Sequence, residues 1–174
     1  MAPASIQVRP GSLVVLIGAP GAGKTTFAHR HFRGSEVLSS DLFRRLLADD
    51  ETDMSVTTQA FGLLDQVLAI RLRRRLVSVV DAINGRPDRR VELVRMARRS
   101  RRPALAIAFA LPAELCVDRD RRRADRQVGA AAVTRIAAEL QRHWPLLPGE
   151  GFDAVHVLRS TADVEEAGVV RVPA

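Results

Sequence analysis

A single lysine marks the segment of the chain where chemistry is expected. The chain has 27 lysine and arginine residues, and because Lys24 is the only lysine, the other 26 are arginines. An ammonium is a compact point charge and a guanidinium is a planar fork, so the two do not substitute freely for each other. Lys24 lies in Gly18-Ala19-Pro20-Gly21-Ala22-Gly23-Lys24-Thr25, which matches the P-loop pattern for phosphate binding.

The P-loop predicts a site for a nucleoside triphosphate. In this motif the backbone N–H groups of the loop and of the following helix converge on phosphate oxygens. We therefore expect ATP or another NTP to contact the loop from Gly18 to Thr26. Lys24 would reach the β- and γ-phosphates, and the hydroxyl of Thr25 would hold Mg²⁺. The alternative is an anion-binding turn with no catalytic use.

The sequence around the loop predicts a doubly wound α/β fold. Residues 12–17 are apolar without alternation, which is typical of a central parallel strand, and a helix is expected over 26–32. Strands and helices then alternate, as in a P-loop NTPase of the adenylate kinase type, with a five-stranded, mainly parallel sheet and helices on both faces. Further strands are expected over 36–40, 76–81, 104–111 and 154–158, and helices over 41–48, 57–75, 89–99, 113–121 and 130–143. Residues 1–11 are expected to be a lead-in, and 154–158 the last strand.

Composition limits the class of protein. A length of 174 residues suits one domain, which we expect to span 1–174. One cysteine suits a reducing, cytoplasmic location, and no segment approaches the roughly 20 apolar residues of a membrane span. A net charge of +7 favours a polyanionic partner, either nucleic acid or a phosphorylated ligand.

Two predicted strand ends carry aspartates. Ligands of doubly wound sheets bind beyond the carboxyl ends of the strands, so Asp41 and Asp81 are both expected beside the P-loop. Asp41 could take the proton of an acceptor hydroxyl. Its alternative role is the N-cap of a helix over 42–48. For Asp81 we expect contact with the water shell of Mg²⁺.

Arginines are concentrated in residues 119–129. We predict that this segment forms a lid that could bring an arginine over the transferred phosphoryl group. The alternative is a solvated helix face. A second cluster is assigned to the surface and consists of Arg71, Arg73, Arg74 and Arg75. The four histidines show no metal-ligand spacing.

The motifs narrow the choice of P-loop protein. GTPases use an Asn-Lys-x-Asp element, which this chain lacks because it has no second lysine, and no Asp-x-x-Gly occurs. A compact kinase remains. Its acceptor is either a nucleic-acid end or a small alcohol such as a sugar, nucleoside or antibiotic. A nucleotide-dependent nucleic-acid-binding module without phosphoryl transfer is the alternative from another class.

Several elements resemble the bacterial end-healing polynucleotide kinases. The elements are the P-loop, Ser39-Ser40-Asp41-x-x-Arg44, Val79-Val80-Asp81-Ala82 with Asn84, Asp125-Arg126-Gln127-Val128 and Glu150-Gly151-Phe152. In particular, the chain is similar to the N-terminal kinase domain of the bacterial polynucleotide kinase-phosphatase of RNA repair, over about residues 12–168.

The resemblance implies transfer of the γ-phosphate of an NTP to the 5′-OH end of DNA or RNA, with Mg²⁺. It also implies that Asp41 is the general base, that Arg44 holds acceptor phosphate, and that Lys24 and Arg126 contact the transferred group. Arg123 matches a lid arginine near the donor. Ile83 stands where the family often has threonine. Phosphatase and ligase-like domains accompany this kinase in the family and are expected partners if the chain is part of a longer protein.

Overall fold

The core of the protein is a five-stranded parallel sheet. The computed structural model describes residues 5–124 and 127–173. The strands lie in the order β3-β4-β2-β5-β6, and each neighbouring pair is parallel. Their bounds are β2 (Leu13–Gly18), β3 (Val37–Ser39), β4 (Ser78–Asp81), β5 (Ala104–Phe109) and β6 (Ala154–Leu158).

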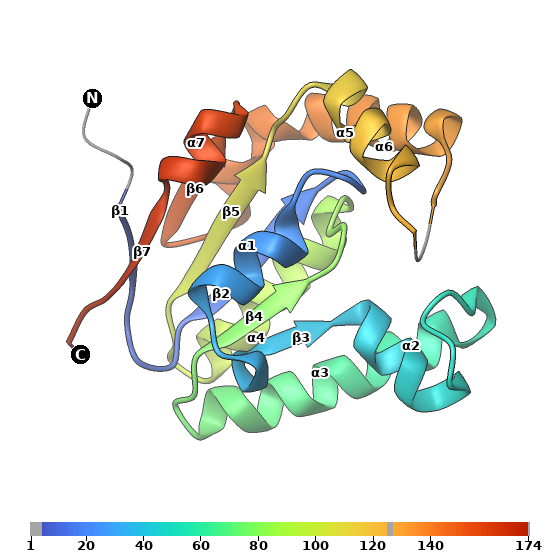
Figure 1. Ribbon diagram of the computed structural model, residues 1–174. Coiled ribbons are helices and arrows are strands. Elements are labelled where there is room, and N and C mark those ends of the chain that lie inside the picture. Colours follow the sequence, from blue (N-terminus) through green and yellow to red (C-terminus); the bar gives the residue numbers. More distant parts are fainter. Residues whose placement is uncertain (1–4, 125–126, 174) are drawn as a thin grey trace.

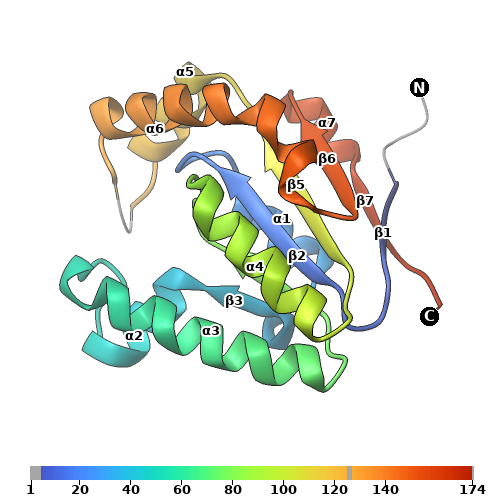
Figure 2. The same ribbon diagram turned by 180° about the vertical axis from the view of Figure 1, so that it is seen from behind.

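The strands at the middle of this sheet, β4, β2 and β5, are buried along their whole length. All six residues of β2 and all six of β5 are buried, and Leu13 is in register with Ala104. Continuous apolar runs of this kind are expected where helices cover both faces of a parallel sheet. The ribbon confirms this arrangement, with α1 on one face and α4 on the other (Figures 1 and 2).

The helices connect the strands as the alternating pattern predicts. Their bounds are α1 (Lys24–His31), α2 (Ser40–Ala48), α3 (Thr57–Arg73), α4 (Pro87–Arg99), α5 (Ala113–Arg121), α6 (Ala130–His143) and α7 (Thr161–Glu166). Three short 3₁₀ helices are η1 (Gly34–Glu36), η2 (Met54–Val56) and η3 (Trp144–Glu150). The protein therefore has the α/β P-loop fold. Within the described ranges, no helix is long and apolar enough to cross a membrane.

The prediction for the two ends of the chain was wrong. Ser5–Val8 forms a strand, β1, and a further strand, β7 (Gly168–Arg171), follows β6. The two pair in parallel as a separate two-stranded sheet, with Ile6 opposite Val169. Each strand is four residues long and finds its partner more than 150 residues away, so local sequence carries little signal for either.

The surface assignment of Arg71 was also wrong. Its guanidinium donates hydrogen bonds to Ser78 Oγ at 3.1 Å and to the carbonyl oxygen of Val77 at 2.8 Å. Burial lowers the pKa of Arg71. The side chain joins the end of α3 to the start of β4, and so it holds the crossover against the sheet.

Candidate active site

The P-loop wraps tightly at two glycines. Gly21 has a φ of 79°, and a β-carbon there would lie 2.2 Å from the carbonyl oxygen of Cys116. Gly23 has a φ of 89° and is the residue before α1. Left-handed backbone at both positions turns the loop toward the N-terminus of the helix. Lys24 is the first helical residue, so the loop and helix form the anion-binding geometry expected of the motif.

Lys24 points back over its own loop. Its Nζ donates hydrogen bonds to the carbonyl oxygens of Gly18 and Ala19, each at 2.8 Å. Only 8% of the residue is exposed. Burial lowers the pKa of Lys24, and the nearby negative charge of Asp81 opposes this shift. A buried, partly compensated ammonium gains from a polyphosphate placed beside it.

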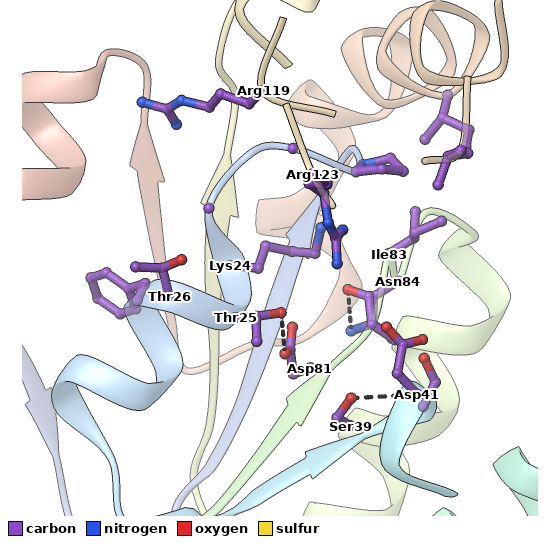
Figure 3. Close-up of a pocket in the computed structure, with 18 of the residues that line it drawn as sticks. Lys24, Thr25, Thr26, Ser39, Asp41, Asp81, Ile83, Asn84, Arg119 and Arg123 are labelled. Atoms are coloured by element: carbon purple, nitrogen blue, oxygen red, sulfur yellow. Dashed lines mark hydrogen bonds between the residues drawn. The ribbon is translucent and has the colours of Figure 1, made fainter. Parts of the chain in front are cut away.

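Thr25 and Asp81 meet at the start of α1 and the end of β4. Thr25 Oγ1 donates a hydrogen bond to Asp81 Oδ2 at 2.7 Å (Figure 3). Burial raises the pKa of Asp81, whereas Lys24 and the hydrogen bond from Thr25 oppose the shift. A hydroxyl and a carboxylate side by side suit Mg²⁺, which prefers oxygen ligands and keeps part of its water shell. Among the described residues, no cluster of three or more His, Cys, Asp or Glu side chains forms a metal site.

Asp41 lies at the start of α2, on the opposite wall of the same cleft. The N-cap of this helix is Ser39, whose Oγ accepts hydrogen bonds from the backbone N–H groups of Asp41 and Leu42. The capping role considered for Asp41 is thereby taken by Ser39. The carboxylate instead accepts a hydrogen bond from Arg44. The negative charge of Asp41 opposes the lowering of the pKa of Lys24 and adds to the raising of the pKa of Asp81, as expected of a neighbouring charge.

Arg44 is fixed in place by its surroundings. The residue is 4% exposed, and its Nε donates a hydrogen bond to the carbonyl oxygen of Glu51 at 2.8 Å. Its other contact is the ion pair with Asp41. The guanidinium therefore holds the carboxylate of Asp41, three residues earlier on the same helix, in one orientation at the cleft surface.

One cleft of about 730 Å³ contains all of these groups. Its floor is the P-loop, where Pro20 and Gly21 face the cleft and the buried residues Ala19 and Ala22 lie beneath. The charged residues that line it are six cationic and three acidic, an excess of three positive charges. They are Arg30, Arg44, Arg119, Arg123, Arg135, Lys24, Asp41, Asp81 and Glu165.

The far wall of the cleft carries the predicted lid arginines. Arg123 points down toward Lys24, and Arg119 extends above the loop, with its Nη1 3.7 Å from where a β-carbon of Gly23 would be (Figure 3). The carboxylate of Asp120 accepts hydrogen bonds from the backbone N–H groups of Val128 and Gly129, which ties the far end of the segment to α5. Arg126 lies outside the described residues.

Other lining residues were missed by sequence reasoning. Arg30, Arg135 and Glu165 lie on α1, α6 and α7, where each is one polar residue of an ordinary helix face. No sequence signal separates them from other surface charges. The tertiary structure alone brings these three helices to one cleft.

A buried ion pair that was also missed supports the cleft from behind. Arg90 and Glu150 are joined at 2.5 Å, and Arg90 is fully buried. Arg90 Nη1 also donates hydrogen bonds to the carbonyl oxygens of Asn84 and Gly85, at 3.0 and 2.6 Å. Asn84 Nδ2 donates to the carbonyl oxygen of Leu16 at 2.7 Å. These contacts position the loop after β4, which contributes Ile83 and Asn84 to the cleft.

A second cavity of about 450 Å³ adjoins the cleft. Phe61, Ile83, Asn84 and Ile136 line both. The shared wall is mostly apolar, and its residues Ile83 and Asn84 lie on the same side of the cleft as Asp41 (Figure 3). The cleft therefore has the P-loop as its floor and an apolar wall beside Asp41.

Comparison with known proteins agrees with this geometry. Residues 13–144 match the family AAA_33, described as AAA domain. No curated protein matches the chain. A solved structure of the Pnkp1/Rnl/Hen1 RNA repair complex aligns with a TM-score of 0.64 and 21% identity, over 82% of this chain and 45% of that one. The chain thus spans less than half the length of this similar protein.

Two further solved structures share the fold. The AvrRxo1-ORF1:-ORF2 complex with ATP aligns with a TM-score of 0.60 and 17% identity, over 79% of this chain and 49% of that one. Shikimate kinase from Acinetobacter baumannii, in complex with shikimate, aligns with a TM-score of 0.52 and 19% identity, over 88% of this chain and 87% of that one. The family match covers most of the chain, the similar structures include a kinase, and the loop, cleft and sheet are as described above. The chain belongs to the AAA domain family and has the fold of the P-loop kinases.

Proposed function

We propose that this protein is a polynucleotide 5′-hydroxyl kinase, which transfers the γ-phosphate of ATP or another NTP to the 5′-OH end of DNA or RNA. The observation that carries the proposal is the Asp41–Arg44 pair, which lines the same cleft as Lys24 and Thr25. A kinase needs a carboxylate near the acceptor hydroxyl and cations on the transferred group. The cleft supplies both.

In the proposed reaction each group has one task. Lys24 and Arg123 neutralise charge on the donor phosphates, and Arg126 is proposed to join them from the lid. Mg²⁺, held through Thr25 with Asp81 beside it, would neutralise further charge on the donor. Asp41 accepts the proton of the acceptor hydroxyl. At the same time the hydroxyl oxygen bonds to the γ-phosphorus, and the bond from phosphorus to the leaving NDP breaks. The proton then passes from Asp41 to solvent.

The excess of positive charge favours an acceptor that itself carries phosphate. Arg44 is already paired with Asp41, but Arg135 also lines the cleft, and a phosphorylated acceptor would offset its charge better than a neutral alcohol would. A nucleic-acid end brings a phosphodiester beside the reacting hydroxyl. Its terminal base has an apolar surface to pack on at Phe61, Ile83 and Ile136. An RNA or DNA end is therefore a better fit than a small neutral sugar.

Asp41→Asn tests the proposal. Asn keeps an oxygen that accepts from Arg44 but cannot take a proton, so transfer to a 5′-OH oligonucleotide should fall at least about 100-fold. ATP affinity and thermal stability should stay near wild type. Asp49→Asn is the matched control, because Asp49 ends the same helix in the left-handed conformation that Asn tolerates, and it should remain active.

A panel of acceptors separates the alternatives. Labelled ATP would be offered with 5′-OH DNA, 5′-OH RNA, nucleosides, sugars and aminoglycosides. Transfer to oligonucleotides supports the proposal. Strong transfer to a small alcohol alone would identify a small-molecule kinase, and ATP binding without transfer to any acceptor would leave a binding module.

A further inference from the structure

Eight arginines gather at the amino ends of the strands, at the edge of the sheet opposite the cleft. They lie on the turn before β2 and at the ends of α3 and α4, which both views place together (Figures 1 and 2). We call this surface the arginine edge. It consists of Arg9, Arg73, Arg74, Arg75, Arg98, Arg99, Arg101 and Arg102.

Contacts around one glycine show how close the two helix ends are. A β-carbon at Gly11 would lie 2.8 Å from Cδ of Arg102 and 3.1 Å from Cα of Arg75. Arg9 is joined to the same turn, since its carbonyl oxygen accepts a hydrogen bond from the N–H of Ser12. The three arginine-bearing segments, far apart in the sequence, therefore form one continuous surface.

The arginines of this edge have no carboxylate partner among the residues that the structure describes. Elsewhere an ion pair joins each of Arg44, Arg45, Arg86, Arg89, Arg90, Arg122 and Arg171 to an Asp or Glu. In the part of the chain that the structure describes, no such pair involves the arginine edge. Seven of its arginines are exposed and Arg102 is partly buried. Unpaired like charges repel one another, and an approaching polyanion relieves that repulsion.

The backbone supplies a second, independent observation. Arg75 and Arg101 have φ values of 59° and 55°, in the left-handed region. Each follows the end of a helix in the Schellman pattern: Leu76 N–H donates to the carbonyl oxygen of Arg71, and Arg102 N–H to that of Ala97. Glycine is the usual residue at this position because it adopts the conformation without strain. Arginine occupies it at both helix ends, which puts the charge where the backbone favours glycine.

We propose that the arginine edge binds the phosphodiester backbone of nucleic acid, as a second contact surface remote from the cleft. None of its residues lines either cavity, so the surface suits an extended polyanion rather than a small phosphate. Binding to a lipid surface would need several apolar side chains among the cations. Between the two helix ends the large exposed apolar side chain is that of Leu76, at 42%. Nucleic acid is therefore favoured over lipid as the partner. The proposal does not depend on the kinase reaction.

Arg75→Gly/Arg101→Gly tests the proposal with little risk of unfolding, because glycine suits both positions. The probe is covalently closed circular DNA, which has no 5′ end for the cleft, titrated over a range of salt concentrations without NTP. The wild type should bind with a steep salt dependence. The variant should bind more weakly, and the slope of log K against log salt should fall by about 2. Arg45→Gln/Arg142→Gln, on α2 and α6, removes the same charge elsewhere and should leave the slope unchanged.

Four results would overturn the proposal. One is an unchanged affinity and slope in the double-glycine variant, and another is an equal loss in the control. The third is displacement of circular DNA by a non-hydrolysable ATP analogue, since that would place the binding in the cleft. Vesicles of phosphatidylserine and phosphatidylcholine serve as the competing polyanion, and preferential binding to them would also contradict it. Transfer to a short 5′-OH acceptor reports separately on the kinase, because it should be equal in wild type and variant.

Discussion

The two ends of the parallel sheet use arginine in opposite ways. At the carboxyl ends, beside the P-loop, Arg44 and Arg90 are buried and paired with carboxylates. At the amino ends, the arginine edge exposes its guanidinium groups without such pairs among the described residues. Buried charges need partners because desolvation is costly, whereas exposed charges do not. Arg44 and Arg90 therefore position other groups, whereas the arginines of the arginine edge remain available to a partner.

Lys24 offers the sharpest test of this comparison. In Lys24→Arg the larger, forked guanidinium cannot take the place of an ammonium that lies 2.8 Å from two loop carbonyls. Turnover should fall at least about 100-fold, a change of roughly 3 kcal/mol in the barrier. The measurement is kcat for transfer to a 5′-OH oligonucleotide, with folding checked by thermal melting. Normal turnover would mean that the site does not require a point charge.

Arg90→Met should produce the largest loss of stability. The change leaves the buried Glu150 carboxylate without its partner and the carbonyl oxygens of Asn84 and Gly85 without a donor. Removing one member of a buried ion pair costs about 3–5 kcal/mol. Urea unfolding at neutral pH measures the change. A loss below about 1 kcal/mol would show that Arg90 is not the support described here.

Arg101→Gly is the counterpart on the arginine edge. The residue has no carboxylate partner among the described residues, and glycine relieves the strain of a φ of 55°. We expect the free energy of unfolding to stay unchanged or to rise by up to about 1 kcal/mol, because the relief of strain is offset by the greater freedom of the unfolded chain. The same urea experiment compares it directly with Arg90→Met. A loss as large as that of Arg90→Met would erase the distinction between the two ends.

His31 should give the smallest effect. Its Nε2 is buried without a partner among the described residues, and burial, then Arg30, lowers its pKa from 6.5. The unfolded chain therefore takes up a proton below about pH 6.5 that the folded protein resists, so stability falls as the pH falls through that value. In His31→Leu this fall should be shallower by a few degrees of Tm. Burial also lowers the pKa of His156, so some dependence remains. Parallel Tm curves for both proteins would contradict the prediction.

Much of the P-loop end of the sheet could be predicted because its signals are local. The P-loop motif is recognised because its glycines and lysine occur at fixed spacing within residues 18–25. The apolar run before it predicts the central strand directly. Asp41 comes just after β3 and Asp81 ends β4, and parallel strands bring such positions to one edge of the sheet. Their placement beside the P-loop is what the sequence leads one to expect, while their roles remain proposals.

The rest depends on contacts between distant segments. β1 pairs with β7, Arg90 with Glu150, and three arginine-bearing turns meet around Gly11. No local pattern distinguishes an arginine that is buried against a distant carboxylate from one left in solvent. The sequence by itself determined the phosphate cradle and the alternation of strands and helices, because each depends on neighbours along the chain. The tertiary structure alone decided which of the arginines are neutralised and which stay exposed, because that depends on what folding brings within a few ångströms.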